Sequence, residues 1–139
     1  MTLTGIALLG ATGSIGRSAL NVVARHRERY AVRAVTSNAN VEALSRIAAE
    51  HQPSFVGVVA PQSAAPHGWR VGAGVLTQAA IRPDVQVVVN AVVGVAGLEA
   101  TLAALLSGKR VALANKESLV VGGELCSPPR QRVGENSCR

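Results

Sequence analysis

The sequence predicts a single α/β domain, an open parallel sheet with helices on both faces. Its 139 residues suit one domain and are too few for two well-built ones. Hydrophobic residues make up 48% of the chain and aromatic residues only 2%, so a core must be built from Val, Ala, Leu and Ile. Such composition is typical of helices packed on a buried parallel sheet. Strand-like and helix-like stretches also alternate along the chain, as in proteins built from β-α-β units.

The first unit is a short strand followed by a helix. Residues 6–9 are an apolar run that ends at Gly10. After it, apolar residues recur with the period of a helix until a cluster of arginines begins. This spacing predicts one buried helix face made of Ile15, Ala19, Leu20, Val22 and Val23.

A second unit repeats the pattern. Residues 31–36 predict a strand and residues 37–40 a turn, because Ser and Asn favour turns. Helical spacing returns over residues 41–51, and residues 55–59 predict a third strand. Three strands joined by two helices are expected to form a parallel sheet with right-handed crossovers.

The second half of the domain is less regular. Prolines and glycines interrupt residues 61–83, so we expect no more there than one helical turn at 78–81. Residues 85–89 are the clearest strand in the sequence, and an Ala- and Leu-rich helix follows over 97–106. Residues 110–114 predict a fifth strand.

The character of the chain changes at Cys126. The residues beyond it include two prolines, have only one large aliphatic side chain and lack any apolar period. We therefore expect a folded domain over residues 1–125 and an irregular tail over residues 126–139.

The net charge of +6 favours an anionic partner, either nucleic acid or a phosphorylated small molecule. The densest basic cluster is Arg25, Arg27 and Arg29, which His26 and Glu28 interrupt. This pattern is typical of the solvated end of a helix. Aromatic residues that could stack on bases are also scarce. Nucleic acid is therefore the less favoured partner.

Other classes of protein are disfavoured by what the sequence lacks. Both cysteines lie in the last fourteen residues, which does not suit a disulfide framework and favours a cytoplasmic protein. No basic segment of a signal peptide and no run of about eighteen apolar residues occurs, so we expect no membrane partner. The histidines, His26, His51 and His67, lack metal-ligand spacing and are expected to be solvated.

The sharpest motif is residues 10–16, Gly-Ala-Thr-Gly-Ser-Ile-Gly, between the first strand and the first helix. Glycines there permit a tight turn and let backbone N–H groups approach a pyrophosphate at the helix N-terminus. The spacing differs from the usual G-x-G-x-x-G, and an ordinary glycine-rich turn is the alternative. The strands and helices around the motif favour a Rossmann-like dinucleotide site.

The residues at the end of the second strand indicate which dinucleotide the site would bind. An Asp or Glu there normally binds the 2′-OH of NAD, whereas residues 36–40 are Thr-Ser-Asn-Ala-Asn. Hydroxyl and amide groups, including those of Asn38 and Asn40, can instead donate hydrogen bonds to a 2′-phosphate. The sequence therefore favours NADP over NAD. Both asparagines also suit a turn and the cap of the next helix, and the two roles can coexist.

A second polar cluster, residues 115–118, follows the fifth strand. Ligands of open α/β sheets bind beyond the carboxyl ends of the strands, where Asn115 can orient an amide or ribose and Lys116 can bind an anionic substrate. Glu117 can position either one. The alternative is an ordinary helix N-terminus with a favourably placed Glu117, and spacing alone does not separate the two interpretations.

Three blocks of sequence together closely resemble 1-deoxy-D-xylulose 5-phosphate reductoisomerase. They are residues 10–16, residues 92–98 with 101–104, and residues 108–120, which are the most specific. The resemblance covers residues 5–125 and implies an amino-terminal NADPH-binding domain. The family converts 1-deoxy-D-xylulose 5-phosphate to 2-C-methyl-D-erythritol 4-phosphate in non-mevalonate isoprenoid biosynthesis. It does so by a skeletal rearrangement followed by hydride transfer from NADPH, as a homodimer with a divalent metal, Mg or Mn.

The resemblance also implies roles for individual residues. It implies that the cofactor phosphates contact Thr12, Gly13, Ser14 and Ile15, and that the adenosine-side phosphate contacts Asn40. It implies further NADPH contacts at Asn115 and Glu117. The sugar phosphate substrate would contact Lys116.

The chain departs from the family in two respects. Where relatives often have Gly-Lys-Asn, this chain has Asn38-Ala39-Asn40, so one positive charge near the 2′-phosphate is missing and weaker NADPH binding is expected. Family enzymes are also about three times as long, and the Asp-Ser-Glu segment that binds their metal does not occur here. We therefore expect no metal ligands in this chain.

The tail and the missing segment suggest a reading-frame shift or a truncation after Leu125. On that hypothesis the chain alone is not catalytically competent. The alternatives are a stand-alone NADP-binding sensor without catalysis and a nonfunctional fragment destabilised by an exposed sheet edge.

Overall fold

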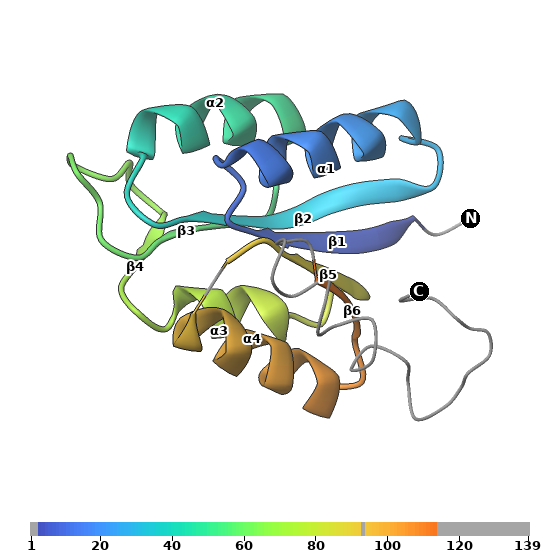
Figure 1. The fold of residues 1–139 in the computed structure, drawn as a ribbon. Helices are drawn as coiled ribbons and strands as arrows, with labels where there is room; N and C mark the ends of the chain where they lie inside the picture. Colours follow the sequence, from blue (N-terminus) through green and yellow to red (C-terminus); the bar gives the residue numbers. More distant parts are fainter. Residues whose placement is uncertain (1–2, 93, 114–139) are drawn as a thin grey trace.

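Six parallel strands form one sheet in the computed structural model, which describes residues 3–92 and 94–113 (Figure 1). Their order across the sheet is β4-β3-β2-β1-β5-β6. The chain first builds outward from β1 to β4, then returns to the other side of β1 and builds outward again. This order confirms the expected Rossmann-like fold. The strands are β1 (Thr4–Leu9), β2 (Tyr30–Ser37), β3 (Phe55–Val58), β4 (Arg70–Val71), β5 (Val87–Asn90) and β6 (Arg110–Leu113).

Helices cover both faces of the sheet, as expected (Figure 1). The first pair, α1 (Ser14–Arg25) and α2 (Val41–His51), lies on one face. The second pair, α3 (Val75–Ala80) and α4 (Val95–Leu106), lies on the other face. The change of face follows from right-handed crossovers, because the direction in which strands are added reverses at β1.

The core consists of two aliphatic layers, one on each face of the sheet. Alternate residues of β1 supply both layers, because successive side chains of a strand point to opposite faces. Leu8 packs with the α1 and α2 side, which includes Leu20 and Leu44. Ala7 and Leu9 pack with the α3 and α4 side. A strand buried on both faces needs the uninterrupted apolar sequence that residues 6–9 have.

The predicted apolar face of the first helix is partly wrong. Leu20 is buried, and Ala19 and Val23 pack against the same core cluster. Ile15 and Val22, however, are 38% and 53% exposed. The sheet is approached instead through Gly16, which is buried. The small glycine therefore sets which side of α1 faces the core.

The middle of the chain contains more structure than its sequence predicts. Where one helical turn was expected at 78–81, α3 runs from Val75 to Ala80 and buries four residues, Val75, Leu76, Ala79 and Ala80. The two-residue strand β4 was not predicted, and it pairs with Gly57 and Val58 of β3. The helix expected at 97–106 begins two residues earlier, at Val95.

The remaining boundaries differ only slightly from the expected ones. The helix expected over 41–51 is observed at Val41–His51. The strand expected at 85–89 is observed at Val87–Asn90, because the N–H of Val85 bonds to the carbonyl of Arg82 in a turn. Residue 114 of the fifth predicted strand and the predicted tail, residues 126–139, lie outside the described residues.

Candidate functional site

The carboxyl ends of β1 and β5 lie side by side at the point where the order of the strands reverses. A Cβ atom on Gly10, which follows β1, would lie 3.2 Å from Cγ2 of Val92 and 3.4 Å from the carbonyl carbon of Ala91, both of which follow β5. The two loops are therefore in contact. Ligands of open α/β sheets bind at this position, beyond the carboxyl ends of the strands.

The turn after β1 is attached to the end of β2. Gly10 has φ +81°, a conformation that glycine adopts at little cost. Its N–H donates to Oγ1 of Thr36 at 3.2 Å, and the N–H of Ala11 donates to the carbonyl of Thr36 at 2.8 Å. Thr36 is fully buried, so it holds the turn from inside the fold.

The helix α1 begins with N–H groups that have no partner of their own. Gly13 is the N-cap and its first helical bond comes from the N–H of Arg17, at 2.9 Å. Within the described part of the chain, the N–H groups of Ser14, Ile15 and Gly16 have no acceptor, and the first turn has no acidic residue. Unpaired N–H groups together with the helix dipole make such a terminus suitable for an anion.

Gly16 brings α1 close to the strand. A Cβ atom at this position would overlap the carbonyl oxygen of Gly10 and would lie 2.8 Å from the Cα of Ala11. Only glycine allows this approach. One turn therefore contains the predicted phosphate-binding residues, Thr12, Gly13, Ser14 and Ile15.

Two hydroxyl groups link this turn to β2. Oγ1 of Thr12 and Oγ of Ser37 lie 3.1 Å apart, and Ser37 is only 2% exposed. The hydroxyls of Thr36 and Ser37 were expected to be available to a 2′-phosphate. Both are instead buried, where they support the glycine turn.

Asn38 and Asn40 are the exposed residues of the turn between β2 and α2. Oδ1 of Asn40 accepts a hydrogen bond from the N–H of Ala43 at 3.0 Å, which confirms the predicted cap of α2. The carbonyl of Asn38 accepts from the N–H of Ala60 at 2.7 Å, which fixes the turn against the loop after β3. The amide hydrogens of both side chains remain suitable donors to an anion, and their contact with a cofactor stays a prediction.

A residue that the sequence analysis missed, Asn90, holds the turn after β5. Its side chain is buried, and Nδ2 donates to the carbonyl of Gly97 at 2.8 Å and to Oγ1 of Thr101 at 2.7 Å. Its Oδ1 accepts from the N–H of Val92 at 2.9 Å. The sequence signal that could have identified this residue is an asparagine that ends an apolar strand just before a glycine turn.

The turn after β5 shares two glycine features with the turn after β1. Gly94 has φ +89°, and a Cβ on Gly97 would overlap the carbonyl oxygen of Val92. The helix α4 also starts without an acidic residue in its first turn. Two glycine turns and two helix N-termini free of acidic residues therefore lie at the same edge of the sheet.

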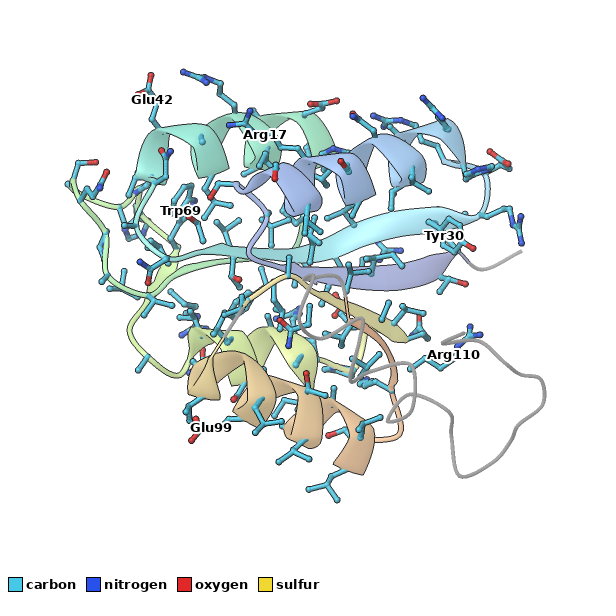
Figure 2. The ribbon with its side chains drawn as sticks, viewed as in Figure 1. Arg17, Tyr30, Glu42, Trp69, Glu99 and Arg110 are labelled. Carbon is cyan, nitrogen blue, oxygen red and sulfur yellow. The ribbon has the colours of Figure 1, made fainter. Side chains whose placement is uncertain are left out.

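A cavity of about 190 Å³ lies at the opposite edge, near the amino ends of β1 and β2. Its lining includes Arg27, Tyr30, Arg33 and His51, and Figure 2 shows Tyr30 at that edge, far from Glu42 at the start of α2. The side chain of His51 is only 7% exposed, so the prediction that it is solvated was wrong. Burial lowers the pKa of His51, an effect that Glu50 opposes and Arg27 reinforces.

The second predicted cluster, Asn115, Lys116 and Glu117, lies outside the described residues. The strand before it, β6, pairs with β5 in parallel, so its carboxyl end is at the edge that carries both glycine turns. In residues 3–92 and 94–113, none of the helices is long and apolar enough to cross a membrane.

The chain matches a family model described as 1-deoxy-D-xylulose 5-phosphate reductoisomerase over residues 6–123. A similar protein, the 1-deoxy-D-xylulose 5-phosphate reductoisomerase of Stutzerimonas stutzeri (strain A1501), is 47% identical over 132 residues. This alignment covers 86% of the chain and 33% of the relative. The chain thus spans about a third of the length of the curated relatives that it matches.

Solved structures agree with this match. The 1-deoxy-D-xylulose 5-phosphate reductoisomerase of Zymomonas mobilis in complex with NADPH superposes with a TM-score of 0.74 at 38% identity, over 90% of this chain and 35% of that one. A DOX-P reductoisomerase in complex with NADPH, fosmidomycin and magnesium gives a TM-score of 0.73 at 36% identity, over 89% of this chain and 33% of that one.

Proposed function

Because the chain belongs to the 1-deoxy-D-xylulose 5-phosphate reductoisomerase family, we propose that residues 1–125 are the NADPH-binding part of such an enzyme. The reaction proposed for the whole enzyme converts 1-deoxy-D-xylulose 5-phosphate to 2-C-methyl-D-erythritol 4-phosphate. The chain spans about a third of its relatives, so we propose that it binds the cofactor on its own but does not turn over.

The observation that carries this proposal is the turn from Gly10 to Gly16 at the reversal point of the sheet. There the unpaired N–H groups of Ser14, Ile15 and Gly16 point out of a helix that carries no acid in its first turn. A pyrophosphate placed at this terminus gains hydrogen bonds and a favourable helix dipole. A relative of similar fold is known in complex with NADPH, which supports this choice of ligand.

We assign the other contacts by position. Thr12, Gly13, Ser14 and Ile15 bind the pyrophosphate, and the amide groups of Asn38 and Asn40 donate to the 2′-phosphate. From the family resemblance we also propose that Asn115 and Glu117 bind NADPH and that Lys116 contacts the substrate. NADPH supplies a hydride when bound, and these residues orient the cofactor so that the hydride is directed toward the substrate.

The described residues do not fit a metal site. Among residues 3–92 and 94–113 there is no group of three or more His, Cys, Asp or Glu side chains that could hold a metal ion. We therefore assign none of these described residues to the divalent metal that family membership implies, and we derive no step through it.

Titration of the 139-residue chain with NADPH tests the proposal. Binding can be measured by calorimetry or by the quenching of cofactor fluorescence. We expect saturable binding and a higher melting temperature, because a ligand that binds only the folded state stabilises it. A flat titration with folded protein contradicts the proposed function. Metal-dependent oxidation of NADPH in the presence of the sugar phosphate contradicts the proposed lack of turnover.

The variant Ser14→Glu locates the site. A carboxylate in the first turn favours the helix through its dipole but repels a pyrophosphate at the same place, so we expect at least about tenfold weaker NADPH binding without loss of fold. Ser18→Glu, one turn later on the exposed side of α1, is the matched control and should bind as the parent does. Equal affinities for the two variants would place the pyrophosphate elsewhere.

A further inference from the structure

The cavity at the amino edge of the sheet lies opposite the proposed cofactor site and has no role in it. The ends of α1 and α2 and the start of β2 line it, and Figure 2 shows one lining residue, Tyr30, at this edge. Its volume is about 190 Å³. An apolar cavity of about 150 Å³ can hold a molecule as large as benzene, so this cavity has room for a small ligand.

An irregularity of the sheet adjoins this cavity. Ile6 of β1 pairs with Val32 of β2, but the next residue of β1 pairs with Ala34. Arg33 is therefore a bulge in the register of two parallel strands. Bulges are rare between parallel strands, and they often lie next to active sites. Both Val32 and Arg33 belong to the cavity lining.

An irregular backbone conformation lies at the same place. Gln52 follows α2 with φ 49° and ψ 56°, and within the described part of the chain it is the one residue other than glycine with a positive φ. Helices usually end on Gly or Asn in this left-handed conformation. Unfavourable conformations of this kind gather at binding sites, and Gln52 lines the cavity.

The third irregularity is a buried imidazole. The side chain of His51 is only 7% exposed and lines the cavity. Its Nε2 lies 4.0 Å from Oε2 of Glu50, which is too far for a hydrogen bond, and no described residue bonds to either ring nitrogen. Buried polar side chains normally have a partner. A ligand in the cavity would supply it.

The charge of the lining favours an anionic ligand. Arg27 and Arg33 belong to the lining, whereas no Asp or Glu does. Tyr30 and Gln52 add neutral donors. Nη2 of Arg27 lies 3.9 Å from Oε2 of Glu50, and because the two side chains are 60% and 64% exposed, this ion pair is weak. An oxyanion can therefore compete with Glu50 for Arg27.

The helix dipoles act against this preference, because α1 and α2 both end near the cavity. A dipole amounts to about half a charge at the helix end, and its effect is confined to the last turn. At the end of α1, three arginines, Arg25, Arg27 and Arg29, are accompanied by one acid, Glu28. The charges of these arginines therefore outweigh the dipole of α1.

We propose that this cavity binds a small oxyanion, the phosphate or carboxylate group of a small molecule, through Arg27 and His51. The guanidinium supplies the opposite charge and the imidazole donates an N–H to an oxygen of the ligand. None of the residues that we assign to NADPH belongs to the cavity lining. The inference is therefore independent of the proposed function, and each can fail without the other.

NMR spectroscopy of the 139-residue chain, titrated with inorganic phosphate and separately with acetate in the absence of NADPH, tests the proposal. We expect saturable shifts of the His51 ring signals with a millimolar dissociation constant, and none at the exposed His67. Sodium chloride at equal ionic strength is the control for screening. Tighter binding of phosphate than of acetate supports a phosphate ligand, and the reverse order supports a carboxylate. The proposal is overturned if neither anion gives a saturable shift, or if chloride gives the same one.

Two substitutions should change the affinity for phosphate in opposite directions. Arg27→Gln removes the positive charge and should weaken binding at least about tenfold, whereas Glu50→Gln removes a competing carboxylate and should tighten binding about threefold. Arg46→Gln is the matched control, because Arg46 is 73% exposed on α2 and lies outside the lining. Circular dichroism checks that each variant folds. Equal affinities for Arg27→Gln and Arg46→Gln overturn the proposal.

A further variant separates this cavity from the proposed cofactor site. Ser14→Glu, which should weaken NADPH binding at the start of α1, should leave the response of His51 to phosphate unchanged. Loss of that response in folded Ser14→Glu would place the phosphate at the start of α1 and would overturn the proposal.

Discussion

The turn before α1 and the turn before α4 share two glycine features but are held by different partners. Each has a glycine with positive φ, Gly10 or Gly94, and a later glycine packed against main chain, Gly16 or Gly97. The first turn is held by Thr36 and Ser37 of the neighbouring strand. The second is held by Asn90, at the end of its own strand.

This difference bears on how the site works. Thr36 and Ser37, which support the first turn, directly precede Asn38. The proposed binding sites for pyrophosphate and 2′-phosphate therefore both depend on the end of β2. The second turn is held by a buried amide that does not involve residues 36–40. We infer that changes at the end of β2 affect the first turn and leave the second unaffected.

The largest expected effect tests the close approach of Gly16 and Gly97 to the main chain. Gly16→Val and Gly97→Val each push a side chain into backbone, so each should lower the free energy of unfolding by about 3 kcal/mol in urea denaturation. Gly13→Ala is the control, because a Cβ there lies 4.0 Å from the nearest atom, the Gly10 carbonyl oxygen, and should cost at most about 1 kcal/mol. Equal stability of all three variants would show that close approach does not constrain these turns.

The next effect separates the two supports. Asn90→Leu leaves the Val92 N–H, the Gly97 carbonyl and the Thr101 hydroxyl without their partner, so we expect a loss of about 2–3 kcal/mol. Thr101→Val removes only one of these bonds and should cost about 1 kcal/mol. If Asn90→Leu costs no more than Thr101→Val, the amide is not the main support of the second turn.

A smaller effect concerns cofactor choice. Asn40→Asp preserves the cap of α2, because Asp and Asn cap helices equally well, but it places a negative charge beside the proposed 2′-phosphate site. We expect about tenfold weaker binding of NADPH and little change for NADH, measured by titration. Asn21→Asp, at an exposed position of α1, controls for net charge. A parallel loss for both cofactors would argue against a 2′-phosphate contact at Asn40.

The smallest effect tests whether the far edge of the sheet is independent of both turns. The lowered pKa of His51 means that the unfolded chain takes up this proton at a higher pH than the folded chain does. Stability should therefore fall as the pH drops below about 6.5, and His51→Gln should leave NADPH affinity at pH 7 unchanged. His51→Gln should reduce this slope in denaturation measured between pH 7 and pH 5, whereas His67→Gln, at an exposed position, should not.

The parts of the fold that local pattern determines were predicted well. The helix Val41–His51 has a cap, an apolar period and a clear end, and its predicted bounds were correct. The short helix α3 was underestimated, since two glycines precede it and its six residues give too little period. The strand β4 has two exposed residues and exists only because β3 lies beside it, which a local pattern does not show.

The candidate site was likewise predicted where neighbouring residues in the sequence form it and missed where distant residues meet. The turn of residues 10–16 was predicted because its glycines stand together in the sequence. The roles of Thr36, Ser37 and Asn90 depend on which strands become neighbours, so the sequence indicated polar residues there without indicating their partners. All assigned contacts remain predictions, namely those of Thr12, Gly13, Ser14, Ile15, Asn38, Asn40, Asn115, Lys116 and Glu117.

The paired hydroxyls of Thr12 and Ser37 have one further consequence. Each oxygen carries a single hydrogen, and only one of the two can lie between them. If Thr12 gives its hydrogen to a phosphate oxygen, as we propose, Ser37 must supply the hydrogen that the pair shares. Binding at the loop after β1 would then fix the direction of a hydrogen bond at the end of β2.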